Sequence, residues 1–164
     1  MKAITLNIFA VLLFSAYTFG QSENLTRSEK IEAFKIQQKC VADASEKEEW
    51  SMVAPCARKS LAILEDLLGK KHRSVALITY EYGLALGYVE NIVESERILK
   101  LAVKRYEEIF GNDSSELIPI LLDYAVAINN VGDFERNSPV SVYSRAFKIF
   151  KNDRNFDRID YADM

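Results

Sequence analysis

The segment "LEDLLGKKHRSVALITYEYGLAL", residues 64–86, has the same pattern as "YEEIFGNDSSELIPILLDYAVAI", residues 106–128. In both stretches an acidic and apolar run ends at a glycine, and a short polar link leads into an apolar run with a tyrosine near its centre. Gly69 and Gly111 correspond at an offset of 42 residues, as do Tyr82 and Tyr124. Self-similarity at such a period is typical of proteins built by stacking one supersecondary unit on the next.

The apolar spacing outside these stretches predicts α-helices throughout. In residues 50–68, apolar side chains recur at spacings of 4, 4, 3 and 4, namely Val53, Ala57, Leu61, Leu64 and Leu68. The same periodicity predicts six helices, over residues 26–44, 50–68, 75–89, 95–110, 115–131 and 140–150. Thr26 and Glu29 form a capping-box pattern at the start of the first helix, and Ser74 is the expected cap of the third. Each helix is too short to be stable alone, so each must bury its apolar stripe against a neighbour.

The bulk composition agrees with one all-α domain. The chain has 164 residues, of which 49% are hydrophobic and 27% charged, so it is apolar enough to form a globular core. Only three prolines and six glycines occur, which favours long helices over turn-rich β structure. The formal charge is −3 and the basic residues are scattered, so nothing supports nucleic-acid binding.

The N-terminus, "MKAITLNIFAVLLFSAYTFGQS", has the pattern of a secretory signal peptide over residues 1–20. The alternative is a membrane anchor, but the apolar run from Ile4 to Phe19 is shorter than the roughly 20 residues that span a bilayer. Cleavage would remove Lys2 and change the net charge from −3 to −4. We therefore expect a secreted or periplasmic protein without a membrane span after cleavage, with a helical domain over residues 21–153 and a tail over 154–164.

Two cysteines, Cys40 and Cys56, would then lie in an oxidising compartment. Their even number is compatible with one disulfide, which the compartment favours. The alternative is two buried free thiols that act as small apolar side chains. The spacing is not that of a zinc site, and the chain has a single histidine, so we expect no metal.

The repeat resembles a tetratricopeptide repeat of the longer, about 42-residue kind found in kinesin light chain-like sequences. The family's pair of a large residue and glycine matches Tyr82-Gly83, and Ser95, Leu99 and Ala102 match the small–large–small pattern of its second helix. Tyr124-Ala125 is a conservative departure, and the first copy is degenerate because Cys40-Val41 holds the equivalent place. The third copy loses the period, since "IFKND" follows "IFGND" by 40 residues. The resemblance implies a right-handed α-solenoid of about three stacked helical hairpins.

In such a stack the first helix of each hairpin lines the concave side. Helical spacing predicts a groove that holds a peptide or a partner protein, with tyrosines as anchors. The alternative is that some of these side chains belong to the core. The candidate groove residues are Tyr80, Glu81, Leu84, Tyr88, Leu122, Asp123, Val126, Asn129 and Asn130.

The sequence offers no catalytic constellation. The single imidazole, His72, lies in the polar link beside Lys71 and Arg73, and no nucleophile accompanies it, so we interpret it as a link or capping residue. The adjacent acidic residues Glu107 and Glu108 would point about 100° apart on a helix, which does not suit a general acid and base. No glycine-rich phosphate loop occurs. We therefore expect neither an enzyme nor a bound cofactor.

These observations predict a non-catalytic interaction module that binds a protein or peptide partner outside the cytoplasm. The alternative is the N-terminal repeat region of a longer envelope protein, because certain TonB-type energy transducers of bacterial envelopes look similar, with repeats ahead of a C-terminal domain. The sequence names neither the partner nor the oligomeric state.

Overall fold

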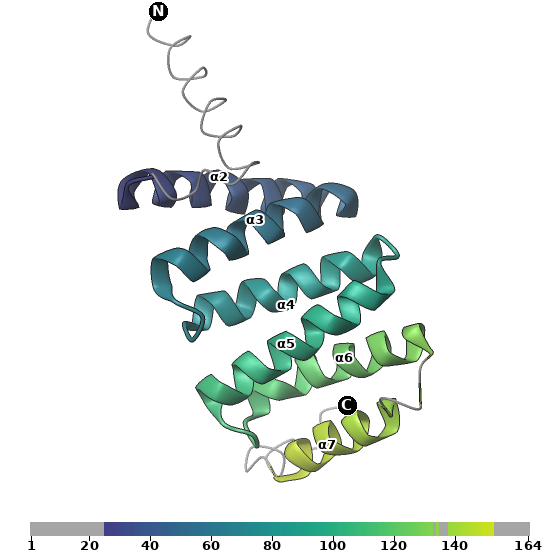
Figure 1. Ribbon diagram of the computed structural model, residues 1–164. Coiled ribbons are helices and arrows are strands. Elements are labelled where there is room, and N and C mark those ends of the chain that lie inside the picture. The colour runs from purple at the N-terminus through teal and green to yellow at the C-terminus, as the bar shows by residue number, and fades with distance from the viewer. Residues whose placement is uncertain (1–24, 133, 135–137, 153–164) are drawn as a thin grey trace, which may run out of the picture. The chain divides into compact units, whose positions relative to one another are not determined.

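The computed structural model describes residues 25–132, 134 and 138–152. The predicted signal peptide, 1–20, and the predicted tail, 154–164, lie outside the described residues. Within the described part the protein is all-helical, with six α-helices, a short 3-10 helix and no strand (Figure 1). The elements are α2 (Arg27–Glu46), α3 (Trp50–Leu68), α4 (Arg73–Tyr88), α5 (Ile92–Phe110), η2 (Ser115–Leu117), α6 (Ile118–Val131) and α7 (Pro139–Asn152). None of the described helices combines the length and apolar character that a membrane crossing needs.

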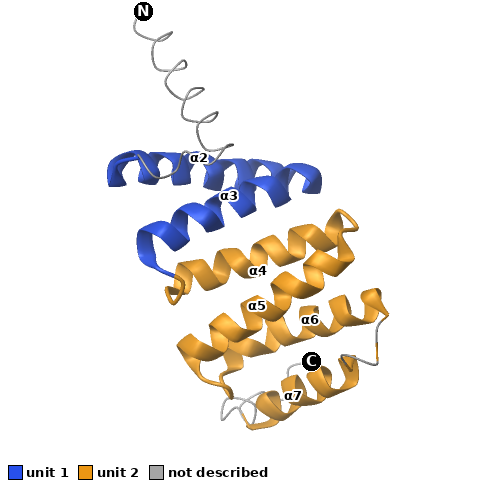
Figure 2. Cartoon of the chain, viewed as in Figure 1, with its two compact units in different colours: residues 1–69 blue, residues 70–164 orange. Residues whose placement is uncertain are grey.

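The chain divides into two compact units, one ending at Gly69 and the other beginning at Lys70 (Figure 2). The first unit contains the hairpin of α2 and α3. A disulfide between Cys40 and Cys56 joins these two helices, with the sulfur atoms 1.98 Å and the Cα atoms 6.1 Å apart. This confirms the predicted pairing over the alternative of two free thiols.

Polar contacts also join α2 to α3. The Lys30 ammonium forms an ion pair with Asp66. The Gln38 side-chain amide donates a hydrogen bond of 3.4 Å to the hydroxyl of Ser60, which is fully buried. Buried small residues let the two backbones approach each other, so this hairpin is held by a covalent link, polar contacts and close packing.

The helix caps agree with the sequence at Thr26 and differ at Ser74, and α5 begins at Ile92, about one turn before the predicted residue 95. Thr26 and Glu29 form the predicted capping box, in which each side chain accepts from the other residue's backbone N–H. The predicted cap at Ser74 is wrong. His72 is the N-cap of α4, because its Nδ1 accepts a 3.2 Å hydrogen bond from the Ser74 backbone N–H. This confirms the interpretation of His72 as a capping residue.

The second unit contains α4, α5, α6 and α7, and consecutive helices alternate in direction (Figure 1). Its core lies between these helices and is filled by large apolar side chains, among them Leu99, Leu117, Ile120, Leu121 and Ile128. Pro119 lies at the start of α6, where a missing N–H is tolerated.

The backbone repeats at the 42-residue period. Gly69 ends α3 with φ 78° and ψ 158°, and Gly111 ends α5 with φ 88° and ψ 160°. The turns after α2, α4 and α6 share a second feature, a residue with positive φ: Glu48 at 57°, Glu90 at 59° and Gly132 at 75°. Gly69 and Gly111 are 42 residues apart, and Glu48, Glu90 and Gly132 follow one another at the same interval. The sequence repeat is therefore also a repeat of local structure.

One residue of the predicted apolar stripe of α3 is solvent-exposed. Leu68 is 40% exposed at the last position of the helix. In α3 the buried face is instead centred on Ala57, Ile63 and Leu64. The predicted stripe of α3 is therefore wrong at its C-terminal end, where the helix turns its last leucine outward.

Helix α7 has a wide apolar surface that is only partly buried. Ala146 and Ile149 are buried in the core of the second unit. Four further large apolar side chains of the helix are exposed: Val140, Tyr143, Phe147 and Phe150. The Lys151 ammonium lies 5.6 Å from the centre of the Phe147 ring.

Candidate functional site

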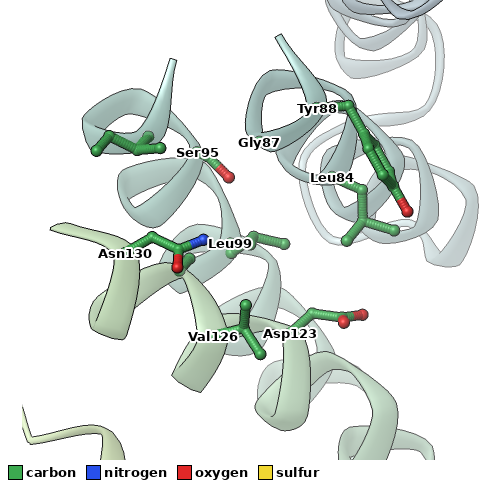
Figure 3. A pocket seen from close by; sticks show the side chains of 10 residues that line it. Leu84, Gly87, Tyr88, Ser95, Leu99, Asp123, Val126 and Asn130 are labelled. Atoms are coloured by element: carbon green, nitrogen blue, oxygen red, sulfur yellow. The ribbon is translucent and has the colours of Figure 1, made fainter. Parts of the chain in front are cut away.

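A pocket of about 320 Å³ lies in the second unit between α4, α5 and α6 (Figure 3). Its lining residues come from all three helices and are mainly apolar: Leu84, Gly87, Tyr88, Ile92, Ser95, Leu99, Asp123, Val126, Ala127 and Asn130. Figure 3 shows Leu84 of α4 and Val126 of α6 pointing into the space between these helices. The volume is at the small end of the range for ligand pockets in proteins.

The floor of the pocket depends on close packing of α4 against α5. Ser95 Oγ donates a buried hydrogen bond of 2.7 Å to the Gly83 carbonyl. A Cβ atom added at Gly83 would lie 2.8 Å from Leu99 Cδ2, so any larger residue would force Leu99 or the helices to move. This contact keeps Ser95 and Leu99 directly below the pocket.

The rim of the pocket is apolar and exposed on both sides. Tyr88 of α4 is 61% exposed and Val126 of α6 is 47% exposed. Exposed apolar groups that face a pocket in common can be covered together by one ligand, which is typical of recognition sites. The two rim helices are the ones that the sequence predicted to line a groove.

A hydrogen bond joins the two rim helices. The hydroxyl of Tyr80 on α4 donates to Oδ2 of Asp123 on α6. Burial raises the pKa of the Tyr80 hydroxyl, and the hydrogen bond to the Asp123 carboxylate raises it further, so the phenol remains a donor throughout the ordinary pH range. The contact fixes the Asp123 carboxylate at one end of the pocket, while Asn130 lies about two helical turns further along α6.

Glu81, next to Tyr80, is half-buried. Burial raises the pKa of its carboxyl above its ordinary value. Glu81 and Tyr106 also interact electrostatically, and the nearby Glu81 charge contributes to raising the pKa of Tyr106, of which burial is the main cause. Glu81 therefore adds acidic character to the face of α4 beside the pocket.

The structure gathers five of the nine predicted groove residues around this pocket: Leu84, Tyr88, Asp123, Val126 and Asn130. Among the other four, Tyr80 holds Asp123 in place and Glu81 is half-buried on α4. Leu122, 42% exposed, and Asn129, also exposed, lie on α6 but do not line the pocket. Whether any of the nine contacts a partner stays a prediction.

The prediction did not include the other five lining residues: Gly87, Ile92, Ser95, Leu99 and Ala127. Ser95 and Leu99 had been singled out, but only for helix packing. The signal that could have identified them is the small residue itself, because a glycine or serine at a helix crossing leaves a hollow beside the larger side chains around it.

The other described histidine, cysteine and acidic side chains form no second candidate site. His72, the single histidine, caps α4 through Nδ1. Within residues 25–132, 134 and 138–152, no three His, Cys, Asp or Glu side chains cluster closely enough to hold a metal ion. The disulfide of Cys40 and Cys56 fits an extracellular or periplasmic location, because such bonds persist in oxidising compartments.

No protein-family model matches this sequence, and no curated protein is detectably similar to it.

Proposed function

We propose that this protein is a non-catalytic interaction module that binds an exposed segment of a partner protein in the groove between α4 and α6. The observation that carries this proposal is the pocket of about 320 Å³ between α4, α5 and α6, with exposed Tyr88 and Val126 on its rim. One apolar side chain of the bound segment would fill the pocket, and the rim would cover its flanks. Burial of that side chain would be the main source of binding free energy.

The proposed architecture is a right-handed α-solenoid of tetratricopeptide-like hairpins. The recurrence of glycine ends at Gly69 and Gly111, and of positive φ at Glu48, Glu90 and Gly132, supports it. The close crossing of Gly83 over Leu99 supports it further, since small residues at this place are part of the resemblance. In a solenoid the first helices of the hairpins share one side, which is where the proposed groove lies.

The proposed location is the periplasm or the extracellular space, reached through a signal peptide over residues 1–20. The disulfide between Cys40 and Cys56 supports it, because such a bond is rare in reducing compartments.

The test is selection of binders from a display library of random linear peptides on the purified protein. Selected peptides are then measured against two variants by isothermal titration calorimetry. Val126→Glu places a charge on the rim of the pocket, and we expect it to weaken binding about tenfold or more, because burying an unpaired carboxylate is costly. Val93→Glu is the matched control, since Val93 is 67% exposed on α5 and does not line the pocket.

The proposal predicts that peptides lose affinity for Val126→Glu and keep it for Val93→Glu. A selection that yields no binders, or only binders that both variants hold equally well, would count against the groove as a binding site. Circular dichroism of both variants checks that the helices are intact.

A further inference from the structure

The residues that line the pocket carry negative charge and no positive charge. Asp123 is the acidic one among them, and none is lysine or arginine. Glu81 lies one turn before Leu84 on α4, so the two side chains share a face of the helix. At the far end of α4, Arg73 lies 3.7 Å from the Glu116 carboxylate, so its charge is already balanced.

The Asp123 carboxylate is held in place by one hydrogen bond and can accept further ones. The Tyr80 hydroxyl takes Oδ2 as its acceptor and thereby fixes the side chain at the edge of the pocket. A carboxylate offers about four acceptor positions on two oxygens, so one phenol leaves room for a cation. A fixed carboxylate also loses little conformational entropy when a cation binds it, which favours a specific contact over a diffuse one.

The apolar and acidic features are adjacent. Figure 3 shows Asp123 beside the space into which Leu84 and Val126 point, with Asn130 at the opposite end. A ligand that places one apolar side chain in the pocket would bring its neighbouring residue to the carboxylate. Charge complementarity at this place favours a positively charged neighbour.

We propose that the pocket recognises a segment in which a large apolar residue is flanked by lysine or arginine, with the apolar side chain in the pocket and the cation on Asp123. This inference rests on the proposed function and adds the chemistry of the bound segment. Glu81 strengthens the negative field on the same face. A segment with an acidic residue at this place would bring its carboxylate next to that of Asp123, and the repulsion would weaken its binding.

The test reads the composition of the peptides selected from the random library. Peptides that depend on the pocket are those that bind the Val126→Glu variant more weakly than the wild type. Among them we expect enrichment of Lys or Arg within one or two residues of a large apolar residue. Replacing that basic residue by glutamine in a selected peptide should weaken binding about fivefold or more, the size of a partly buried charged hydrogen bond.

Asp123→Asn isolates the charge, because an asparagine oxygen can still accept the hydrogen bond from Tyr80. We expect it to weaken binding of the basic peptide by the same factor and to leave the glutamine peptide unaffected, so that the two changes are not additive. We also expect it to flatten the dependence of affinity on salt concentration. Asp113→Asn is the matched control, since it removes an exposed carboxylate of the same unit that does not line the pocket.

The outcomes separate this inference from the proposed function. Pocket-dependent peptides without basic enrichment, or an Asp123→Asn variant that binds basic peptides unchanged, would overturn the inference and leave the groove standing. Peptides that are all insensitive to Val126→Glu would overturn both. Sedimentation velocity tests whether the protein self-associates. If it does, and if Val126→Glu and Phe147→Ala each abolish the association, then α7 of a second copy occupies the pocket and the inference is overturned.

Discussion

Gly83 on α4 crosses Leu99 on α5 so closely that a Cβ atom at position 83 would lie 2.8 Å from Leu99 Cδ2 and 3.2 Å from the Leu99 backbone nitrogen. The contact is stabilised by the hydrogen bond from Ser95 to the Gly83 carbonyl. The hairpin of α4 and α5, and with it the floor of the pocket, therefore depends on the absence of a side chain at one position.

Gly83→Ala is expected to lower the free energy of unfolding by about 1–3 kcal/mol, because a methyl group must push apart two packed helices. The measurement is urea unfolding followed by circular dichroism. Gly87→Ala is the comparison, since its Cβ would lie 3.2 Å from Ser95 Oγ and 4.0 Å from Ser95 Cβ and would approach no backbone atom of α5 within 4 Å. Equal stability of the Gly83→Ala protein and the wild type would show that the crossing can widen without cost.

Glu90→Gly is expected to stabilise the protein by about 1 kcal/mol. Glu90 has a φ of 59°, a left-handed conformation that a side chain makes unfavourable and that glycine adopts freely. The equivalent residue 42 positions later, Gly132, has a φ of 75° and supplies the precedent within the same chain. Chemical denaturation measures the gain, and Glu90→Gln, which removes the charge but keeps the strain, should stay within about 0.5 kcal/mol of the wild type. Destabilisation by the glycine would argue that the Glu90 side chain makes a contact that outweighs its backbone strain.

Reduction of the disulfide is expected to destabilise the hairpin of α2 and α3 by about 3 kcal/mol. Cys40 and Cys56 are separated by 16 residues, and a closed loop of this size restricts the unfolded chain by about that amount. Hydrogen exchange with and without reductant localises the effect, which should be largest in residues 27–68. A Cys40→Ala, Cys56→Ala double variant should exchange fast in both conditions, and equal protection of this hairpin in the reduced wild type would contradict the prediction.

Glu81→Gln is expected to stabilise the protein at neutral pH and to have no effect at low pH. Burial raises the pKa of Glu81 above 4.5 in the folded state, so the folded protein binds a proton more readily than the unfolded chain. The wild type therefore loses stability as pH rises through 4.5 and on through the raised pKa, and the uncharged glutamine avoids this loss.

Unfolding midpoints in urea, measured across this pH range for both proteins, test the prediction for Glu81. The two curves should meet below 4.5 and separate above it. Curves that stay parallel at every pH would mean that the glutamine acts through packing and not through the charge.

Much of the helical framework could be predicted because local chemistry decides it. Apolar periodicity and a terminal glycine define the ends of α3 at Trp50 and Leu68 and the end of α5 at Phe110. The turns after residues 44 and 89 could be predicted, but the positive φ at Glu48 and Glu90 could not be, since glutamate carries no signal for it. These residues adopt it because the hairpin geometry, repeated at Gly132, requires it.

The pocket could be predicted only in part for a similar reason. The faces of α4 and α6 follow from helical spacing, which identified Leu84, Tyr88 and Val126. The floor depends on how far α5 lies below the other two helices, a tertiary quantity that spacing does not contain. Helical spacing also identified Asp123 but not its hydrogen bond with Tyr80, because a pairing of side chains 43 residues apart depends on how the helices pack.

Because the backbone angles at Gly69 and Gly111 match, residues 70–111 follow one such glycine and end at the other. A chain in which this segment is written twice passes through the same glycine geometry at the new junction as at the old one. Duplication or deletion of this segment, in evolution or by design, would therefore keep the same glycine backbone geometry at the new junction.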